Sequence, residues 1–498
     1  MRKNNSYYRA IKCVIPANQT KVKAVSHLIS EYSKTMHSCL IYMDETMQKN
    51  GEKPAIHSHL KPNDIGSKLS ARYVQTAYSQ ARGVYISWLA KLTNKIRSLI
   101  TCSSIEGIEK TILYRINARH MWYVQKASLD WKIADGIMVV PSPEDKVKSI
   151  IVPDNLMKLS RRLMKRARKL VSRPNLLRIK TMILDYREAI IEPSRRNTIF
   201  PYWIHLSTMI KGKPISLPIK RNPYFDKRLA NGKLLNSLQV SISENNKVSV
   251  APIIEYKKAP LRTSGRSIGL DWGVTSLFSS SEGRMVGRRM LDRLKELDAV
   301  LTDYTAELQR NKKPLKKDAR YRSLHSRISS YVKNEVGRVL NRLADEDVRE
   351  IVVERLNFRG GGLSKRMNRI VSIAGRHEVE AKLARLRDER GVSIVHVDPA
   401  YTSQECSRCG YVNRKNRKSQ SAFKCLCCGH VGNADVNAAL NILGRSRDIV
   451  PSGRDSTGRK TIHHVLLDRH AKHCPSGNHV ATAANIGVVA SSVVDVGL

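Results

Sequence analysis

Two closely spaced cysteine pairs constrain this chain more than any other feature of its sequence. Cys406 and Cys409 form one C-x2-C pair, and Cys425 and Cys428 form a second one after a gap of 15 residues. A C-x2-C turn aims two thiolates at one point, and the glycine after each pair permits a tight backbone around the sulfurs. Two such pairs at this separation predict one tetrahedral zinc site made by all four cysteines.

The predicted zinc is structural. A segment of about 25 residues buries too little apolar surface to fold alone, and zinc supplies about 10–16 kcal/mol to comparable peptides. Four cysteine ligands leave no open coordination position, so we expect no catalysis by this metal. Cys427 is a fifth thiol that can replace Cys425 or Cys428, but the spacing and the trailing glycine favour those two. Buried or redox-active cysteines without a metal are the alternative interpretation.

The charge of the chain indicates what it binds. The 498 residues include 88 Lys and Arg against 43 Asp and Glu, a formal net charge of +45. Such an excess favours a polyanionic partner, because each neutralised phosphate releases counterions. An anionic membrane surface is the rival to nucleic acid, but the sequence has no apolar run of about 18 residues and no signal peptide. We therefore expect a soluble, cytoplasmic protein that binds nucleic acid and no membrane.

Basic residues gather in two segments. Residues 161–173 (RRLMKRARKLVSR) form a predicted basic helix that Pro174 interrupts, and a second basic run lies between the two cysteine pairs. A solvated charged face is the alternative for the helix, but the net charge favours a surface that faces nucleic acid. The candidate nucleic-acid contacts are Arg161, Arg162, Lys165, Arg166, Arg408, Arg414, Lys415 and Arg417.

The N-terminal half combines β and helical patterns. Residues 7–15 predict a strand that ends at Pro16, and apolar residues recur at helical spacing from about 20 to 110. From about 199 to 256 the pattern changes to strands. We predict two hairpins there, one turning around 211–213 and the other at 244–246. The strand at 7–15 can join this β-unit, which flanks the helical segment.

The C-terminal half predicts an α/β domain. A buried strand over 267–280 precedes two long antiparallel helices that Pro314 separates. The strand predicted over 349–358 has a continuous apolar run, and a helix at 379–390 and another strand follow it. From about 446 onward this organisation is lost, and we expect a mobile or loosely docked tail. Its residues His463, His464, His470, His473 and Cys474 match no metal-binding spacing that we recognise.

Three acidic residues stand out in apolar surroundings. Asp271 and Glu354 end predicted buried strands, and Asp435 lies at or near the first turn of a predicted helix. An isolated buried carboxylate costs several kcal/mol unless it is paired or bound to a metal. Three of them can converge on two Mg²⁺ ions roughly 3.5–4 Å apart. Singly, Asp271 can cap a turn, Glu354 can pair with Arg355 or Arg359, and Asp435 can cap its helix.

Four segments in this order resemble the TnpB family of insertion-sequence proteins and the related compact type V CRISPR effectors. They are GLDWGVTSLFS, IVVERLNFRG, VDPAYTSQECSRCG and FKCLCCGHVGNADVNAALNIL. The resemblance is specific over roughly 265–445, whereas residues 1–264 match only in the order of their elements. It implies a RuvC-like nuclease of RNase H-like fold, split into three blocks that supply Asp271, Glu354 and Asp435, with the zinc module inserted before the third.

The resemblance also implies a domain layout. A β-barrel-like wedge domain (1–20 and 199–262) is interrupted by a helical recognition lobe (21–198). The split nuclease domain takes 263–400 and 430–445, and the zinc-binding target-nucleic-acid module takes 401–429. Residues 446–498 are the mobile tail. The chain departs from the family pattern in Trp272, where small or aliphatic residues are common, and in its length.

The implied function is RNA-guided cleavage of DNA. A guide RNA pairs with one strand of a double-stranded DNA target, and a single Mg²⁺-dependent site cuts the DNA, while Zn²⁺ stays structural. A guided DNA-binding repressor without cleavage is one alternative, but all three carboxylate positions are occupied. A DNA-joining transposase is the other, and it would not need a co-purifying transcript.

Overall fold

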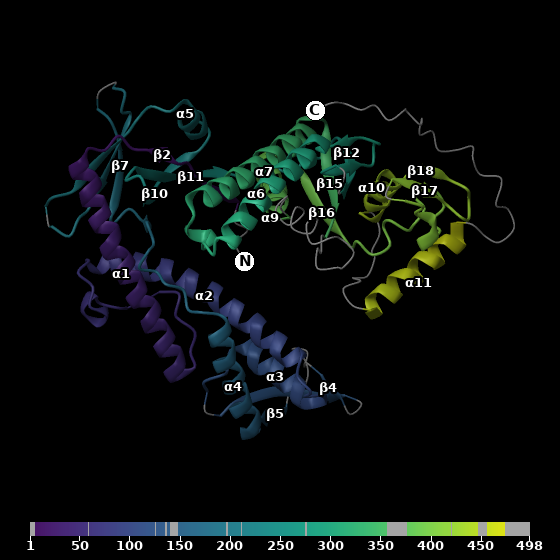
Figure 1. Cartoon of the computed structure of the whole chain (residues 1–498), viewed down its shortest axis with the longest axis horizontal. Helices are drawn as coiled ribbons and strands as arrows, with labels where there is room; N and C mark the ends of the chain where they lie inside the picture. The colour runs from purple at the N-terminus through teal and green to yellow at the C-terminus, as the bar shows by residue number, and fades with distance from the viewer. Residues whose placement is uncertain are drawn as a thin grey trace. The chain divides into compact units, whose positions relative to one another are not determined.

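The chain forms two compact units, Met1–Lys257 and Lys258–Leu498. Figure 1 shows the computed structural model of the whole chain, and each unit is described here by itself. The structure describes residues 5–57, 59–124, 126–134, 137–139, 148–195, 198–210, 212–273, 276–355, 376–419, 421–446 and 456–473. No helix within these ranges is long and apolar enough to span a membrane.

The first unit begins and ends in one open sheet with the order β1-β11-β10-β6, and β2 also pairs with β11. Its strands are β1 Ser6–Ala10, β2 Cys13–Val14, β6 Thr181–Leu184, β10 Lys233–Ile242 and β11 Val248–Lys257. The predicted N-terminal strand therefore joins the β-unit, as a pair of short strands. The turn between β10 and β11 holds Asn246 at φ 55°, where the short polar side chain of asparagine tolerates the left-handed conformation.

A second sheet contains the other predicted hairpin. Its strands are β7 Ala189–Pro193, β8 Tyr202–Leu206 and β9 Ile215–Ile219, and β8 pairs with both neighbours in antiparallel fashion. The short helix α5 Pro223–Leu229 follows. Both β-sheets have open strand orders, and the barrel-like shape of this region remains a prediction.

Four helices make up most of the segment between these strands. They are α1 Gln19–Asn50, α2 Ala71–Thr101, α3 Gly107–Arg119 and α4 Asp154–Leu170, with a 3-10 turn, η1, at Pro62–Ile65. Their apolar faces share one core with the two sheets. Asn18 starts α1 as its N-cap, since its side chain accepts from Lys21 N at 2.9 Å. Gly51 ends this helix at φ 73°.

The predicted boundary of the helical lobe at residue 198 is wrong. Strands β6 and β7 lie inside the range 21–198, and β6 pairs with β10 from Leu184↔Leu238 to Thr181↔Ser241. A three-stranded sheet also interrupts the helices, with strands β3 Ser128–Ala134, β4 Ile137–Val139 and β5 Lys148–Ile151. Runs of four or five residues such as TMIL and AIIEP are too short to show a period, and they become strands because each completes the edge of a neighbouring sheet.

The second unit is built on a mixed five-stranded sheet with the order β14-β13-β12-β15-β16. Strand β15 runs parallel to both β12 and β16, whereas β13 pairs antiparallel with β12 and β14. The strands are β12 Arg266–Trp272, β13 Phe278–Ser280, β14 Met285–Val286, β15 Val348–Glu354 and β16 Ser393–Val397. Residues 356–358, the end of the strand predicted over 349–358, lie outside the described residues.

Helices cover both faces of this sheet. One face packs Ile268, Leu270, Ile351 and Val353 against α6 Arg288–Arg310, α7 Ala319–Asp345 and α9 Arg376–Arg390. The other face packs Val352 and Val397 against Ile442 of α10 Ala434–Arg445. Figure 1 shows α6 and α7 on one side of β12 and β15, and α10 on the other.

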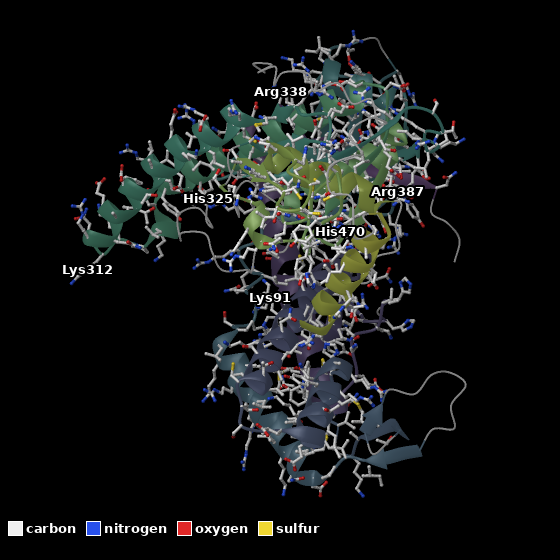
Figure 2. All side chains as sticks on the ribbon, turned by 90° about the vertical axis from the view of Figure 1, so that its right-hand side faces the viewer. Lys91, Lys312, His325, Arg338, Arg387 and His470 are labelled. Carbon is white, nitrogen blue, oxygen red and sulfur yellow. The ribbon has the colours of Figure 1, made fainter. Side chains whose placement is uncertain are left out.

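The two predicted long helices are present, and the 3-10 turn η2 Leu315–Lys317 lies between them. Figure 2 shows Lys312 at the tip of this helical pair, with His325 and Arg338 along α7. Asp318 caps α7 by accepting from Tyr321 N at 2.7 Å. The buried leucine, isoleucine and valine side chains of both helices pack in one core with the sheet.

The predicted mobile tail contains an ordered helix, α11 Ser456–His473. Ile462 and Leu466 are buried against Val412 of the zinc module, and Ala400 and Tyr401 pack beside them. The sequence pattern missed this helix because two buried apolar residues make too short a stripe to stand out. Residues 474–498 lie outside the described part of the chain.

Candidate active site and metal centre

The register of two parallel strands places Asp271 beside Glu354. Leu270 of β12 pairs with Val353 of β15, so the next residue on each strand is one of the two acids. Side chains alternate between the faces of a sheet. Because Leu270 and Val353 both enter the core with α6 and α7, Asp271 and Glu354 share the opposite face. Both lie at the carboxyl ends of their strands.

Helix α10 brings Asp435 to that same face. The helix lies so close to β12 that a Cβ on Gly269 would stand 2.2 Å from the carbonyl oxygen of Ala439. Gly269 and Asp271 are two residues apart and therefore point to the same side. Asp435 lies in the first turn of α10, one turn before Ala439. The absence of a side chain at Gly269 thus permits the approach of the helix that carries the third acid.

Asp435 does not cap its own helix, which was one alternative from the sequence. Asn433 does so instead, because its Oδ1 accepts from Asp435 N at 2.9 Å and from Val436 N at 3.1 Å. The alternative for Glu354 also lacks support, since it forms no ion pair with Arg355 within the described residues. Arg359 lies outside them. The Asp435 carboxylate therefore does not serve as the N-cap of α10.

Burial and neighbouring charge both act on the acids at the strand ends. Burial raises the pKa of Asp271 well above its usual range, and the charges of Glu354 and Asp435 raise it further. Burial also raises the pKa of Glu354 to about 7, against the opposing charge of Arg445. These shifts mean that the ionised site is unfavourable without a cation. Hard carboxylate oxygens are the ligands that Mg²⁺ prefers.

Arg417 supplies one positive charge to this site. Its Nη2 donates to Oδ1 of Asp435 at 2.8 Å, and its charge opposes the rise in the pKa of Asp271. The sequence predicted a phosphate contact for Arg417 from the basic run around it. The structure instead gives it a carboxylate partner, which lies 18 positions away in sequence. The zinc module therefore reaches the carboxylate site through this side chain.

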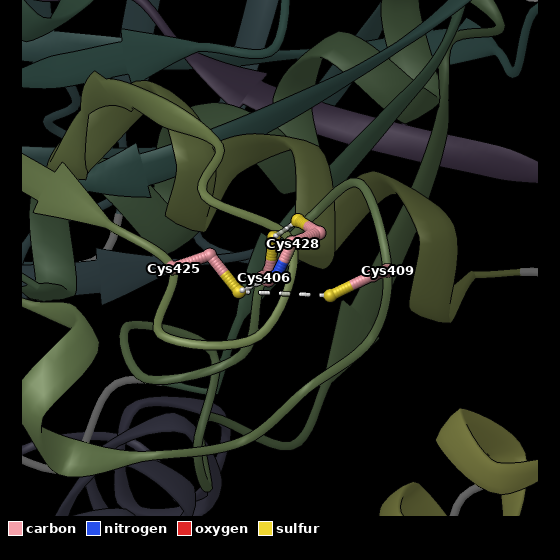
Figure 3. Close-up of side chains that lie close together, drawn as sticks. All are labelled: Cys406, Cys409, Cys425 and Cys428. Carbon is pink, nitrogen blue, oxygen red and sulfur yellow. Dashed lines mark hydrogen bonds between the residues drawn. The ribbon is translucent and has the colours of Figure 1, made fainter. Parts of the chain in front are cut away.

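The four predicted zinc ligands converge. Cys406 Sγ lies 3.7 Å from Cys428 Sγ, and Cys409 Sγ lies 3.6 Å from Cys425 Sγ, as Figure 3 shows. All four sulfurs lie within 4.8 Å of one another, a grouping that no other set of possible ligands attains in the described ranges. The three carboxylates form a looser group. Four soft sulfur donors in this arrangement fit zinc with no open position.

The backbone around the sulfurs explains the two glycines. Gly410 and Gly429 adopt φ values of 74° and 69°, which residues with a Cβ rarely adopt. Gly410 N donates to Cys406 O at 2.8 Å and closes the first turn. The neighbouring Cys409 thiol lowers the pKa of Cys406 to about 5, and the same interaction raises the pKa of Cys409, so a bound cation would be needed to hold all four cysteines as thiolates. The two-stranded ribbon β17 Ala422–Lys424 and β18 Val431–Asn433 carries the second turn.

Cys427 lies outside the group of four and faces α11. Its Sγ is 3.7 Å from His470 Nε2, and His470 Nδ1 lies 2.8 Å from the carbonyl oxygen of Cys409. Tyr411 packs against the His470 ring with their centroids 5.2 Å apart. His470 therefore contacts the zinc module as a hydrogen-bond partner, and Cys474 lies outside the described residues.

The other predicted nucleic-acid contacts have different surroundings. Arg408, Arg414 and Lys415 are exposed on the zinc module, where 414–416 forms the 3-10 turn η3. Of the four residues predicted on α4, Arg162, Lys165 and Arg166 are exposed. Arg161 differs, because its Nη2 donates to the carbonyl oxygen of Val124 at 3.0 Å and fastens α4 to the preceding segment. Their contact with nucleic acid stays a prediction.

Sequence reasoning missed a set of buried polar residues on α10. Asn437, Asn441 and Arg445 recur at four-residue intervals and all bond to the segment that leads into the first cysteine pair. The signal was present in NADVNAALNILGR, because polar residues at positions i, i+4 and i+8 of a helix share one face. Because the rest of this helix is largely apolar, polar residues repeated on one face indicate that this face is buried and hydrogen-bonded.

Comparison with known proteins connects this half of the chain to characterised families. The family described as "Cas12f1-like, TNB domain" matches residues 377–442. The putative RNA-guided DNA endonuclease InsQ of Escherichia coli is 29% identical over 210 residues, which cover 39% of this chain and 52% of InsQ. A TnpB-like protein of Aquifex aeolicus is 33% identical over 123 residues, 24% of this chain and 40% of that protein. The chain thus spans about half or less of these relatives' length.

Solved structures give a weaker likeness. A complex of Cas12f1 with a single-guide RNA and target DNA aligns with 88% of this chain and 99% of that one, at 15% identity and a TM-score of 0.39. A score this low does not establish a shared arrangement of the whole molecule. The sequence matches are the stronger finding.

Proposed function

The matches support assignment of this chain to the TnpB family, and from that premise we propose that it is an RNA-guided DNA endonuclease. One observation carries the proposal. Asp271 and Glu354 end adjacent parallel strands on one face of the sheet, and α10 adds Asp435 on the same face. A mixed sheet with acids at its parallel strand ends supports a RuvC-like nuclease domain of RNase H-like fold.

The proposed site binds Mg²⁺ through Asp271, Glu354 and Asp435. Bound Mg²⁺ supplies Lewis-acid activation of water and stabilises the leaving oxygen of the phosphodiester. The protein holds the three carboxylates on one face of the sheet. Burial raises the pKa of Asp271 and of Glu354, and the other two acids raise that of Asp271 further, so a bound cation would be needed to keep these acids ionised.

The Arg417 guanidinium has two partners in this proposal, the Asp435 carboxylate and a phosphate of the bound strand. Without a cation it pairs with Asp435. With a nucleic-acid strand bound, its planar guanidinium can instead donate two parallel hydrogen bonds to a phosphate. The zinc module holds Arg417 between its cysteine pairs, so a structural Zn²⁺ would fix this side chain beside the carboxylates.

The remaining assignments concern nucleic-acid binding. The exposed basic face of α4, with Arg162, Lys165 and Arg166, is proposed to contact the backbone of the guide–target duplex. The exposed Arg408, Arg414 and Lys415 of the zinc module are proposed to contact the DNA strand that is cut. Base pairing with the guide RNA reads the sequence, and the protein reads the shape of the duplex.

Sequencing the RNA that co-purifies with the protein, expressed together with its native flanking DNA, tests the guided function. A defined transcript from the end of the element supports it and provides the guide for a Mg²⁺-dependent cleavage assay. Heterogeneous host RNA alone would contradict it and favour an unguided DNA-binding protein.

Asp271→Ala then tests the cleavage site. We expect this variant to lose cleavage and to keep guide-dependent DNA binding, because Asp271 contacts metal and not the duplex. The matched control is Asp303→Ala, which removes an exposed acid from α6 in the same unit. Full cleavage by Asp271→Ala would refute the assignment. Binding without cleavage by the unaltered protein would instead support a guided repressor.

A further inference from the structure

Three buried polar side chains of α10 fasten the helix of Asp435 to the segment that enters the zinc module. Asn437, Asn441 and Arg445 lie at four-residue intervals on one face of α10. All three are almost fully buried, at 2%, 7% and 3% exposure. Their common partner is Glu405, the residue immediately before Cys406, which is itself buried.

The contacts converge on this one residue. The carbonyl oxygen of Glu405 accepts from Asn437 Nδ2 at 2.8 Å and from Asn441 Nδ2 at 2.7 Å. Its carboxylate accepts from Arg445 Nη2 at 2.8 Å. Asn437 also accepts from Ser407 N at 2.9 Å through its Oδ1. The two residues that flank Cys406 are thus both hydrogen-bonded to α10.

Arg445 extends the attachment to the end of strand β16. Its Nη1 donates to the carbonyl oxygens of Asp398 and Ala400 at 2.9 and 2.6 Å. Asn441 Nδ2 adds a bond to the carbonyl oxygen of Thr402 at 2.9 Å. The loop 398–405 crosses from the sheet to the zinc module, and α10 holds it at four of its residues.

These hydrogen bonds connect to two of the proposed Mg²⁺ ligands, Asp435 and Glu354. Asp435 lies two residues before Asn437 on the same helix, and the charge of Arg445 acts on Glu354 at the end of β15. Buried hydrogen bonds of this kind have strict geometry and a high cost when one partner is lost. Apolar side chains at these three positions could also pack α10 against the loop. They would not fix the position of the helix along the loop, because apolar contacts are not directional.

We infer that Asn437, Asn441 and Arg445 are positioning residues for Mg²⁺ binding, which set α10 against loop 398–407 so that Asp435 meets Asp271 and Glu354. The inference rests on the proposed nuclease function and deepens it, because these residues touch neither metal nor substrate. Residues that orient the ligands of a metal typically change metal affinity or activity by about 10–100-fold when they are replaced.

The test compares Asn437→Ala and Asn441→Ala with Asn341→Ala. The control removes an asparagine that accepts a hydrogen bond from Lys382, on the other face of the same sheet. Mn²⁺ binding is measured by calorimetry on the zinc-containing protein with and without guide RNA, and the Mg²⁺ concentration for half-maximal cleavage is measured on the protein–guide complex. Zinc content, guide-dependent DNA binding and the thermal midpoint complete the set.

We expect Asn441→Ala and Asn437→Ala to weaken Mn²⁺ binding and to raise the half-maximal Mg²⁺ concentration about 10-fold, with zinc content and DNA affinity unchanged. Saturating Mg²⁺ should restore part of the cleavage rate. Metal affinities equal to those of Asn341→Ala would overturn the inference. So would a parallel loss of zinc, DNA binding and activity, which is what a purely structural role produces.

A second variant covers the buried ion pair. Arg445→Ala alone leaves the Glu405 charge unpaired and risks misfolding, whereas Arg445→Leu combined with Glu405→Leu replaces the pair by apolar groups that such sites often tolerate. The double variant should fold, keep zinc and bind Mn²⁺ more weakly. Unchanged Mn²⁺ affinity in a folded double variant would contradict the role of Arg445. If the unaltered protein shows no guided cleavage, the proposed function fails, but the Mn²⁺ comparison still decides the positioning role.

Discussion

Adding a single methyl group at Gly269 should disable the proposed nuclease site without altering any acid. The new Cβ would stand 2.2 Å from the carbonyl oxygen of Ala439 and 2.9 Å from Cβ of Leu443. The first neighbour is backbone, which cannot rotate away. An ordinary contact begins at 3.4 Å, so this separation must grow by at least 1.2 Å. Helix α10 or strand β12 has to move by about that amount.

Both stability and catalysis should respond to Gly269→Ala. Overpacking of this kind costs about 1–3 kcal/mol, which corresponds to a fall of roughly 2–12 °C in the melting temperature of a unit of this size. A displacement near 1 Å at a reacting group can cost about 10²-fold in rate. We expect the single-turnover cleavage rate to fall by about that factor at saturating Mg²⁺.

Gly444→Ala is the matched control for this change. Gly444 lies on the same helix, and no atom lies within 4 Å of the Cβ that alanine would add. Alanine also favours a helix over glycine by about 1 kcal/mol, so this variant should be as stable as the parent or more so, with full cleavage. If Gly269→Ala melts and cleaves like Gly444→Ala, then α10 does not rest on β12 as described, and Asp435 does not depend on that contact.

Three further changes test the metals and the charges of the site. Cys409→Ser should lose bound zinc, as measured by metal analysis, and should speed hydrogen exchange in residues 401–440. Unchanged zinc content would point to Cys427 as a ligand. Arg417→Ala should lower the cleavage rate about 10–10²-fold at saturating Mg²⁺, because a positive charge at the reacting phosphate is lost. Arg417→Lys should recover part of this rate. A full cleavage rate in the alanine variant would exclude this role of Arg417. Because burial raises the pKa of Glu354 to about 7, the folded metal-free protein favours the neutral form. Its stability contribution is therefore present at low pH and is lost as pH rises through about 7. Melting of the zinc-containing protein without added Mg²⁺ from pH 5 to 8 should show this fall, and Glu354→Gln should reduce it, while the raised pKa of Asp271 leaves a remainder of the same sign; equal slopes for both proteins would contradict the assignment.

The zinc ligands were predictable because their geometry is local. A C-x2-C turn with a following glycine specifies its own backbone, and the structure confirms the convergence of the four sulfurs. The parallel strands of the nuclease unit were also predictable, since continuous apolar runs such as Ile351–Val353 mark strands that are covered on both faces. The nearness of Asp271 to Glu354 follows from that pairing.

Features that depend on distant partners escaped prediction. Arg417 lies in a basic run, and nothing in that run distinguishes the one cation that pairs with Asp435. Helix α11 has a buried surface of two apolar residues and a histidine, whose partners lie some 50 to 60 positions earlier in the chain. Strand β6 is only four residues long and is defined by the edge of β10. In each case a tertiary contact, and not a local period, decides the structure.

The cysteine cluster and the carboxylate site form one physical unit, although the metals proposed for them have different roles. The ribbon and turns around the cysteines hold Arg417, whose charge offsets part of the repulsion among the buried acids. The residues on both sides of Cys406 are bonded to the helix that carries Asp435. A module of this size depends on its metal for folding. Loss of zinc should therefore remove both the compensating charge and the anchor of α10, and excess Mg²⁺ cannot replace either, because neither is a Mg²⁺ ligand.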